Sequence, residues 1–280
     1  MTSFDNTILA NDRRGISQLR PYVSSEMCLE AADFILEKAD GCVGIVTGFY
    51  EIGPGVIETD GPPGAMALGR ALAALGIKVI YVTDRFGMSF LADGQNPALV
   101  VEFPIADDSK SEAFARRFLN EFKPGVMIAV ERCSVTARGT YLNMSSVDIT
   151  HFTARTDYLF TLHGSTVGIG DGGNEIGMGG LQDAIRESPN LPDEPAATAT
   201  TKLVIASVSN WGAYGVVAAL SRRCGKDLLP DSIAETDLIA ELVERGAVDG
   251  FYMKPITRVD GFTMGENSFV LESLRNEIFS

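Results

Sequence analysis

The sequence predicts an α/β fold: a doubly wound, mostly parallel sheet flanked by helices in a Rossmann-like arrangement of three layers. Short apolar runs alternate along the chain with longer stretches of helical periodicity, and this alternation is typical of parallel sheets. The runs are apolar at nearly every position, as expected for strands that are buried on both faces. A length of 280 residues with 45% hydrophobic residues is enough for one such domain, which we expect to span residues 1–280.

The first complete β–α–β unit is expected between residues 42 and 83. The run Cys42–Thr47 predicts a buried strand, and Gly48 begins the loop that leaves its carboxyl end. A helix is predicted from Pro62, because proline is favoured in a first helical turn and Gly76 supplies the residue just past the helix end. A strand at 77–83 completes the unit.

The same alternation continues to the end of the chain. Further strands are expected near residues 98–103, 125–130 and 202–207, and helices near residues 25–39, 84–92, 108–122, 153–162, 211–223, 231–245 and 266–279. Parallel sheets bind ligands at the carboxyl ends of their strands. Thr47 and Gly48 stand at one such end, and Glu131 and Arg132 at another, so we expect these residues near a ligand.

The glycine-rich stretch 166–180, TVGIGDGGNEIGMGG, is the strongest candidate for the floor of an active site. Seven of the thirteen residues from 168 to 180 are glycine. Each glycine costs roughly 0.5–1 kcal/mol relative to alanine in regular structure, so such a run is tolerated where the backbone must take positive φ or approach a ligand closely. Asp171, Asn174 and Glu175 are set among main-chain N–H groups that can face an anion.

The loop 48–64 places Glu58 and Asp60 immediately before the helix that begins at Pro62. Acids in this position can simply cap the helix and complement its dipole. However, a loop of this length at the carboxyl end of a strand is longer than the connection requires, and long ordered loops are usually functional. The two interpretations stay open.

Two further pairs of residues have both a structural and a functional interpretation. Glu131 and Arg132 can form an ion pair, or Arg132 can bind a substrate carboxylate through its planar guanidinium. Asn210 and Trp211 can belong to a helix cap, or they can line a pocket beside the strand near 202–207.

Composition and charge exclude several classes of protein. A net charge of −14 without a basic cluster argues against binding to nucleic acid or to anionic membranes. The sequence has neither an apolar run long enough to span a membrane nor an N-terminal signal peptide pattern, so we expect a cytoplasmic protein. Four widely spaced cysteines and two histidines indicate neither a disulfide framework nor a zinc site.

A nucleotide cofactor is not expected either. Gly168, Gly170 and Gly173 match the pattern GxGxxG, but a dinucleotide fingerprint follows the first strand of a β–α–β unit, whereas a proline-rich loop at 188–197 comes after this one. The patterns GxxxxGK[ST], HExxH and GxSxG are all absent from the sequence, which argues against the common nucleotide hydrolases, zinc proteases and α/β-hydrolases.

Taken together, six segments resemble the D-glutamate cyclase family, and more narrowly its C-terminal, glutamate-cyclase-like domain. These segments are ETDGPPGA at 58–65, ER at 131–132, YLNM at 141–144, VGIGDGGNEIGMG at 167–179, SNWGAY at 209–214 and VDGF at 259–262. They follow in collinear order over nearly the whole chain. The additional N-terminal domain of the mammalian mitochondrial members has no counterpart in this sequence, and the loop 49–57 differs from theirs in length and content.

The resemblance implies a lyase that dehydrates D-glutamate intramolecularly to 5-oxo-D-proline. The α-amine attacks the γ-carboxyl carbon and water leaves, so the reaction needs a base, an acid and stabilisation of an oxyanion. The roles implied are base and acid for Asp171 and Glu175, oxyanion donors for the amides of Gly172 and Gly173, and carboxylate binding for Arg132. Glu58 and Asp60 are further catalytic candidates, and Thr47, Gly48, Asn174, Asn210 and Trp211 are further substrate-binding candidates.

Alternatives stay open for both the acids and the function. Glu58, Asp60, Glu131 and Asp171 can instead bind a divalent ion such as Mg²⁺ or Mn²⁺, because hard cations favour oxygen ligands. A non-catalytic sensor of an amino acid or nucleotide would use the same glycine-rich floor without turnover. The expected partner is a small-molecule amino acid, and a homo-oligomer is compatible with the sequence.

Overall fold

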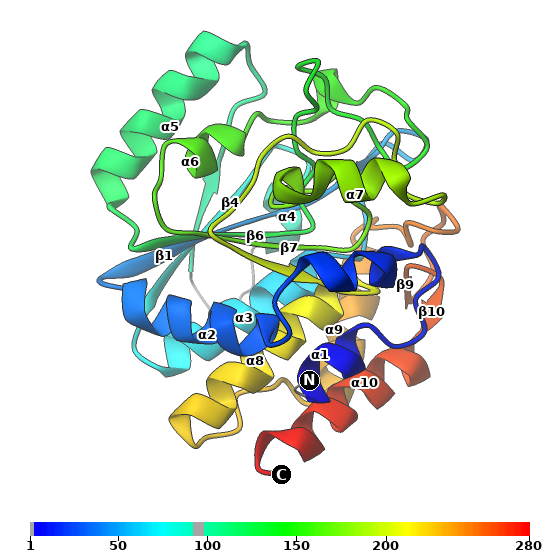
Figure 1. The fold of residues 1–280 in the computed structure, drawn as a ribbon. Coiled ribbons are helices and arrows are strands. Elements are labelled where there is room, and N and C mark those ends of the chain that lie inside the picture. Colours follow the sequence, from blue (N-terminus) through cyan, green and yellow to red (C-terminus); the bar gives the residue numbers. More distant parts are fainter. Residues whose placement is uncertain (1–2, 92–97) are drawn as a thin grey trace.

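The computed structural model describes residues 3–91 and 98–280, and its centre is a six-stranded sheet with helices on both faces (Figure 1). The strands are β1 (Cys42–Thr47), β4 (Lys78–Thr83), β5 (Leu99–Glu102), β6 (Val126–Val130), β7 (Thr166–Gly170) and β8 (Lys202–Ile205). Their order across the sheet is β5-β4-β1-β6-β7-β8, and every pair of neighbours is parallel. The predicted doubly wound α/β fold is confirmed.

The alternation of side chains along β6 shows why both faces must be covered. Val126, Ile128 and Val130 belong to one buried apolar cluster, while Met127 and Ala129 belong to another on the opposite face. The first face packs against α2 (Met27–Lys38), α3 (Pro62–Ala74) and α8 (Ser209–Cys224), and the second against α5 (Asp108–Phe122) and α6 (Asp157–Thr161). Figure 1 shows these two layers below and above the sheet.

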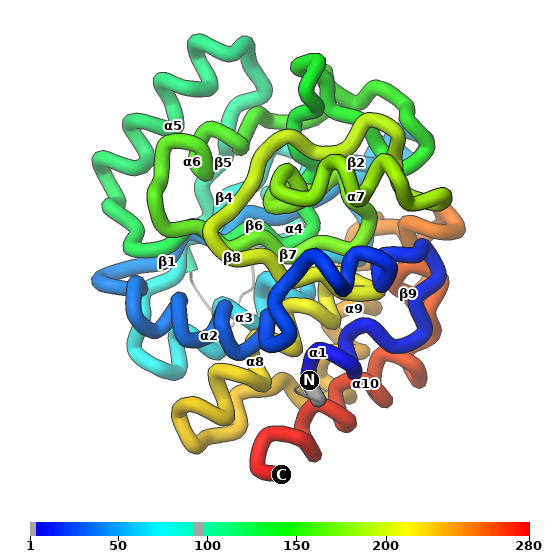
Figure 2. Tube along the Cα trace, viewed as in Figure 1, coloured from blue at the N-terminus to red at the C-terminus, as the bar shows by residue number. Residues whose placement is uncertain are grey.

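Additional helices cover α8 on its outer side. They are α1 (Ser3–Ile8), α9 (Ser232–Glu244) and α10 (Met264–Ile278). The first and last helices lie side by side (Figure 2), and the hydroxyl of Thr7 donates a hydrogen bond of 2.7 Å to Glu277. Among the described helices, none has the length and apolar character needed to cross a membrane.

The remaining elements are short and lie mostly in the connections. They are the helices α4 (Met88–Leu91) and α7 (Gln182–Glu187), the 3-10 helices at Ile16–Tyr22, Thr150–Phe152 and Gly179–Leu181, the strand pair β2 (Tyr50–Glu51) and β3 (Val56–Ile57), and the pair β9 (Arg258–Val259) and β10 (Phe262–Thr263). The predicted helix at 84–92 therefore exists only as α4, and its expected last residue lies outside the described residues.

The first five residues of the glycine-rich stretch form β7, a strand that the sequence analysis did not predict. The reason is that Gly168 carries no Cβ, a feature that usually weakens a strand. A Cβ at this position would lie 2.6 Å from the carbonyl oxygen of Ile176 and 2.7 Å from Cα of Gly177. The glycine therefore lets the returning segment pack directly against the strand.

The sheet has one point where the direction of chain progression reverses. From β1 the chain proceeds outward through β4 to β5, and then it returns to β6 on the other side of β1 and proceeds to β7 and β8. Numbered along the chain, the strand order is 3-2-1-4-5-6, which is the order of a doubly wound dinucleotide-binding sheet. Ligands bind in the crevice at such a reversal, outside the carboxyl ends of β1 and β6.

Candidate active site

The crevice beyond β1, β6 and β7 contains seven buried carboxylates, which we call the acidic cluster. Its members are Glu51, Glu58, Asp60, Glu131, Asp171, Glu175 and Asp260, and none has more than 6% of its surface exposed. Burying a charge is costly unless it is paired, hydrogen-bonded or neutralised. So many acids in one place therefore point to a site that binds a cation, a proton or both.

Asp60 is held in place by a helix that begins far away in the sequence. Its Oδ2 accepts the N–H of Ser209 and its Oδ1 accepts the N–H of Asn210, each at 2.8 Å. These are the first two residues of α8, so Asp60 does cap a helix, but that helix is α8 rather than α3. Asn210 in turn accepts the N–H groups of Gly61 and Gly64 at 3.0 and 2.8 Å. The turn at 58–64 is thereby fixed to the start of α8.

Glu131 leaves the end of β6 with an unusual backbone conformation. Its φ of 45° is in the left-handed region, which non-glycine residues rarely adopt and which recurs at functional sites. The hydroxyl of Ser209 donates a hydrogen bond of 2.5 Å to its Oε2. The end of β6 and the start of α8 therefore both lie close to the 58–64 turn, and Ser209 is the link between Asp60 and Glu131.

Arg132 points away from its neighbour Glu131 and is 1% exposed. Its guanidinium donates to the carbonyl oxygen of Gly48 at 2.6 Å, to Asp84 at 2.7 Å and to the hydroxyl of Thr156 at 3.3 Å. Each of its three nitrogens therefore has a partner within the protein. The geometry favours the ion-pair interpretation over carboxylate binding, with Asp84 rather than Glu131 as the partner.

The glycine-rich turn after β7 folds back onto its own acid. Glu175 accepts the N–H of Gly172 at 2.7 Å and the N–H of Gly173 at 2.8 Å, one on each oxygen. These are the two amides that were expected to stabilise an oxyanion, and in the structure they bind this carboxylate instead. Asn174 donates to the carbonyl oxygen of Leu142 at 3.1 Å.

Asp171 lies at the centre of the cluster and is fully buried. Its Oδ1 contacts Nη1 of Arg14 at 2.5 Å, while its Oδ2 has no hydrogen-bond partner among the described residues. Nη2 of Arg14 contacts Oδ1 of Asp260 at 2.8 Å. Arg14, Asp260 and Glu51 were not assigned a role from the sequence, although Asp260 belongs to the quoted VDGF segment. The N-terminal position of Arg14, 157 residues before Asp171, gave no signal.

Burial raises the pKa values of acids of the cluster, among them Glu51, Asp60 and Asp171. The pKa of Glu51 rises from 4.5 to about 7 and that of Asp60 from 3.8 to about 8, with burial as the largest cause and the charge of Asp260 adding to both shifts. Burial also raises the pKa of Asp171 well above its usual range, although Arg14 opposes the shift. In the absence of another cation, part of the cluster therefore holds protons near neutral pH.

Two groups of carboxylates are close enough to bind a metal ion. One consists of Asp60, Asp171 and Asp260, and the other of Glu131, Asp171 and Glu175, with ligand oxygens within 4.8 Å of one another. Asp171 belongs to both groups, whereas Glu58, a predicted ligand, belongs to neither. The Oδ2 atoms of Asp171 and Asp260 are buried without hydrogen-bond partners among the described residues. This donor set fits a hard divalent cation, which prefers carboxylate oxygens.

A cavity of about 220 Å³ opens next to the cluster. The side that carries charge consists of Arg14, Glu51, Glu58 and Glu131, and the remaining lining residues are Phe49, Asn143, Met144, Ser145, Gly250, Phe251 and Met253. Trp211 does not line this cavity: it is fully buried, packs against Phe262 and donates to Asn267 at 2.7 Å. The pocket-lining interpretation of Trp211 therefore does not hold, and Asn210 supports the 58–64 turn instead.

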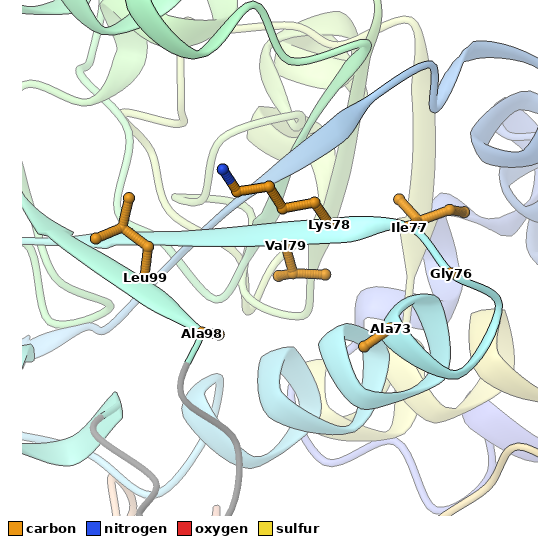
Figure 3. Close-up of a pocket in the computed structure, with 7 residues that line it drawn as sticks. All are labelled: Ala73, Gly76, Ile77, Lys78, Val79, Ala98 and Leu99. Atoms are coloured by element: carbon orange, nitrogen blue, oxygen red, sulfur yellow. The ribbon is translucent and has the colours of Figure 1, made fainter.

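A second cavity, of about 390 Å³, lies at the opposite edge of the sheet, where β4 and β5 begin (Figure 3). Lys78 is the one charged residue among the described residues that line it, and Figure 3 shows Lys78 and Val79 pointing to opposite sides of β4. No acid is among the described residues that line this cavity, and it does not lie at the carboxyl ends of the strands. It therefore lacks the carboxylate groups found beside Asp171.

Comparison with known proteins connects this site to a family. The family model described as "D-glutamate cyclase-like, C-terminal" matches residues 6–275. Human mitochondrial D-glutamate cyclase is 34% identical over 181 residues, which are 58% of this chain and 29% of the human protein. The match thus spans less than a third of that relative. Because the family model covers nearly the whole chain, this protein belongs to the D-glutamate cyclase-like C-terminal domain family.

Proposed function

We propose that this domain is a hydro-lyase that converts D-glutamate to 5-oxo-D-proline and water. The observation that carries the proposal is the group of acids around Asp171, with Arg14 among them, beside a cavity of about 220 Å³. The similarity to human mitochondrial D-glutamate cyclase supports the choice of substrate.

The charge of the substrate fits a cavity with both signs. D-Glutamate carries two carboxylates and one ammonium group, and the acids that line the cavity attract the ammonium. A carboxylate needs a cation nearby, and Arg14 is the one basic residue among the described residues that line the cavity. Its Nη1 and Nη2 contact Asp171 and Asp260, so Arg14 would attract a substrate carboxylate through its positive charge and not through a bidentate contact.

We also propose that a divalent ion, Mg²⁺ or Mn²⁺, binds to Asp60, Asp171 and Asp260. When bound, the ion would supply positive charge that makes a carboxyl carbon more electrophilic. Asp60 and Asp171 were among the ligands expected from the sequence. Asp260 was not expected, and the expected ligands Glu58 and Glu131 do not belong to this group.

Proton transfer is then the task of the acids that line the cavity. Ring closure removes two protons from the substrate nitrogen, and the departing oxygen needs two protons to leave as water. One carboxyl group near both atoms can accept and return them without net uptake. Glu58 suits this role, because it lines the cavity and burial raises its pKa well above the usual range, so that it can hold a proton near neutral pH. Glu175 is less suited, since both of its oxygens already accept N–H groups.

Proton NMR of the purified protein tests the proposal. D-Glutamate and 5-oxo-D-proline are incubated separately, with Mg²⁺ and with EDTA, and L-glutamate serves as the stereochemical control. We expect interconversion of the two D-compounds that depends on the enzyme. Binding of D-glutamate by calorimetry without any interconversion would instead favour the non-catalytic sensor.

A further inference from the structure

We infer that Arg14 is a positioning residue that prepares Asp171 and Asp260 to bind a divalent cation. Its guanidinium engages one oxygen of each acid and thereby leaves the second oxygen of each available to the ion. The inference rests on the metal site of the proposed function, but it concerns cation binding and not turnover.

The segment that carries Arg14 is held firmly in place. Oδ1 of Asp12 accepts the N–H groups of Arg14 and Gly15 at 3.0 and 2.8 Å, which closes a tight turn. The guanidinium of the preceding residue, Arg13, lies 3.6 Å from the centre of the Phe262 ring. Because these contacts hold the segment on either side of Arg14, they define where its side chain reaches before any ligand binds.

The two acids come from different parts of the fold, and Arg14 joins them. Asp171 follows β7, whereas Asp260 lies in the turn between β9 and β10 with a φ of 50°. Nη1 of Arg14 is 2.5 Å from Oδ1 of Asp171, and Nη2 is 2.8 Å from Oδ1 of Asp260. Without this bridge, two buried carboxylates would repel one another across the site.

The carboxylate oxygens of Asp171 and Asp260 that lack hydrogen-bond partners indicate the role of the Arg14 bridge. Asp171 is fully buried and Asp260 nearly so, yet Oδ2 of Asp171 and both oxygens of Asp260 lack hydrogen-bond partners among the described residues. The contact of Arg14 with Oδ1 of Asp260 is an ion pair. Buried oxygens without partners are rare in proteins and call for an explanation such as an ion. Arg14 therefore donates a hydrogen bond to one oxygen of Asp171 and pairs with Asp260 by charge, and the oxygens that lack hydrogen-bond partners stay open to an ion.

A competing interpretation is that Arg14 occupies the place of the ion and must leave before it binds. The geometry argues against this, since Arg14 contacts only one oxygen of Asp171 and one of Asp260, while Oδ2 of each has no hydrogen-bond partner among the described residues and stays open to the ion. The two interpretations predict opposite changes in cation affinity when Arg14 is removed. If Arg14 competes with the ion, removing it strengthens cation binding; if it positions the ligands, removing it weakens cation binding, even though a repelling positive charge is lost.

The test measures the affinity of the purified full chain for Mn²⁺ by electron paramagnetic resonance of the free ion. Arg14→Gln removes the bridge, and Arg14→Lys keeps the charge but replaces the planar fork with a single ammonium that cannot span both acids. Arg138→Gln is the control, because it removes the same charge from a side chain that is 77% exposed and pairs with Glu194 rather than with either acid. Circular dichroism and thermal melts in EDTA establish that each variant is folded.

We expect Arg14→Gln to weaken Mn²⁺ binding about tenfold or more, as is usual when a partner of a metal ligand is lost. Arg14→Lys should weaken binding by a smaller factor, and it decides the test if the glutamine variant does not fold. Arg138→Gln should change the affinity less than twofold. Unchanged or tighter Mn²⁺ binding in the folded Arg14 variants would overturn the inference, as would a wild-type protein that binds no Mn²⁺. Mn²⁺ binding without D-glutamate turnover would refute the proposed function alone.

Discussion

Arg132 is a buried cation whose partners all belong to the protein. Its nitrogens bind the carbonyl oxygen of Gly48, the carboxylate of Asp84 and the hydroxyl of Thr156, so it connects the ends of β1, β4 and β6. Disrupting a buried ion pair is strongly destabilising, and lysine keeps the charge but cannot reproduce the planar donors. At the residue scale, therefore, Arg132 matters for folding.

We predict that Arg132→Lys lowers the free energy of unfolding by about 2–4 kcal/mol. Urea denaturation measures this, with Arg138→Lys as the control, because the side chain of Arg138 is 77% exposed. If Arg132 instead binds a substrate carboxylate, which is the second interpretation of the sequence, the lysine variant should lose substrate affinity with little change in stability. If that result is obtained, Arg132 returns to the list of substrate-binding residues.

The sequence motifs identified most of the acids, but not the cation among them. Glu58, Asp60 and Glu131 could be recognised by their position after predicted strands. Asp171 and Glu175 could be recognised because they stand in the glycine-rich stretch. Arg14 could not be found in this way, because its contact with Asp171 joins residues 157 positions apart and the N-terminal segment carries no motif. Which partner a side chain selects depends on tertiary packing, and local patterns do not determine it.

At the element scale, the connection between the 58–64 turn and α8 positions the acids. Gly61 takes a φ of 97°, and a Cβ at this position would lie 2.7 Å from Cβ of Glu131. No side chain fits there, so the turn can approach the end of β6 closely enough for Ser209 to contact both Asp60 and Glu131.

We predict that Gly61→Ala lowers the free energy of unfolding by about 3 kcal/mol or more, because it combines backbone strain with a steric clash. Gly76→Ala is the matched control: Gly76 also has positive φ, at 82°, but no atom lies within 4 Å of the added Cβ. Gly76→Ala should lower the free energy of unfolding by only about 1 kcal/mol. Equal losses of stability in the two variants, measured by urea denaturation, would mean that the close approach at Gly61 is unimportant.

The bounds of regular elements could be predicted where local signals agree. The strand Cys42–Thr47 and the helix Asp108–Phe122 occur as expected. The first is an unbroken apolar run, and in the structure the side chain of Asp107 caps the second by accepting the N–H of Lys110. The strand Thr166–Gly170 was missed, since its glycines lower the local preference for a strand and only tertiary packing against residues 176–177 compensates.

For the whole molecule, the acidic cluster is a source of instability that depends on pH. Buried acids with raised pKa values favour the protonated folded state, so the folded protein binds more protons than the unfolded chain between the unfolded and folded pKa values. For Glu51 this window extends from 4.5 to about 7, and for Asp60 from 3.8 to about 8. The contribution of these groups to stability is therefore present at low pH and is lost as the pH rises through the window.

We predict that the metal-free protein in EDTA has a free energy of unfolding at least about 1 kcal/mol higher at pH 5 than at pH 8. Mn²⁺ should reduce this difference, because a bound cation replaces the protons and stabilises the ionised acids most at pH 8. Urea denaturation at the two pH values, with and without Mn²⁺, provides the measurement. Higher stability at pH 8 in EDTA would show that the cluster is ionised at little cost in the folded state.

The most direct test of the account measures the formation of 5-oxo-D-proline from D-glutamate in the presence of Mn²⁺, with chiral chromatography as the assay. Three proteins are compared. They are the wild type, Asp171→Asn and the control Asp183→Asn, whose replaced side chain is 97% exposed. We predict that Asp171→Asn lowers kcat about 100-fold or more while remaining folded, because Asp171 belongs to both carboxylate groups. Asp183→Asn should match the wild type. An Asp171→Asn protein as active as the wild type would contradict the central claim that catalysis takes place in the acidic cluster.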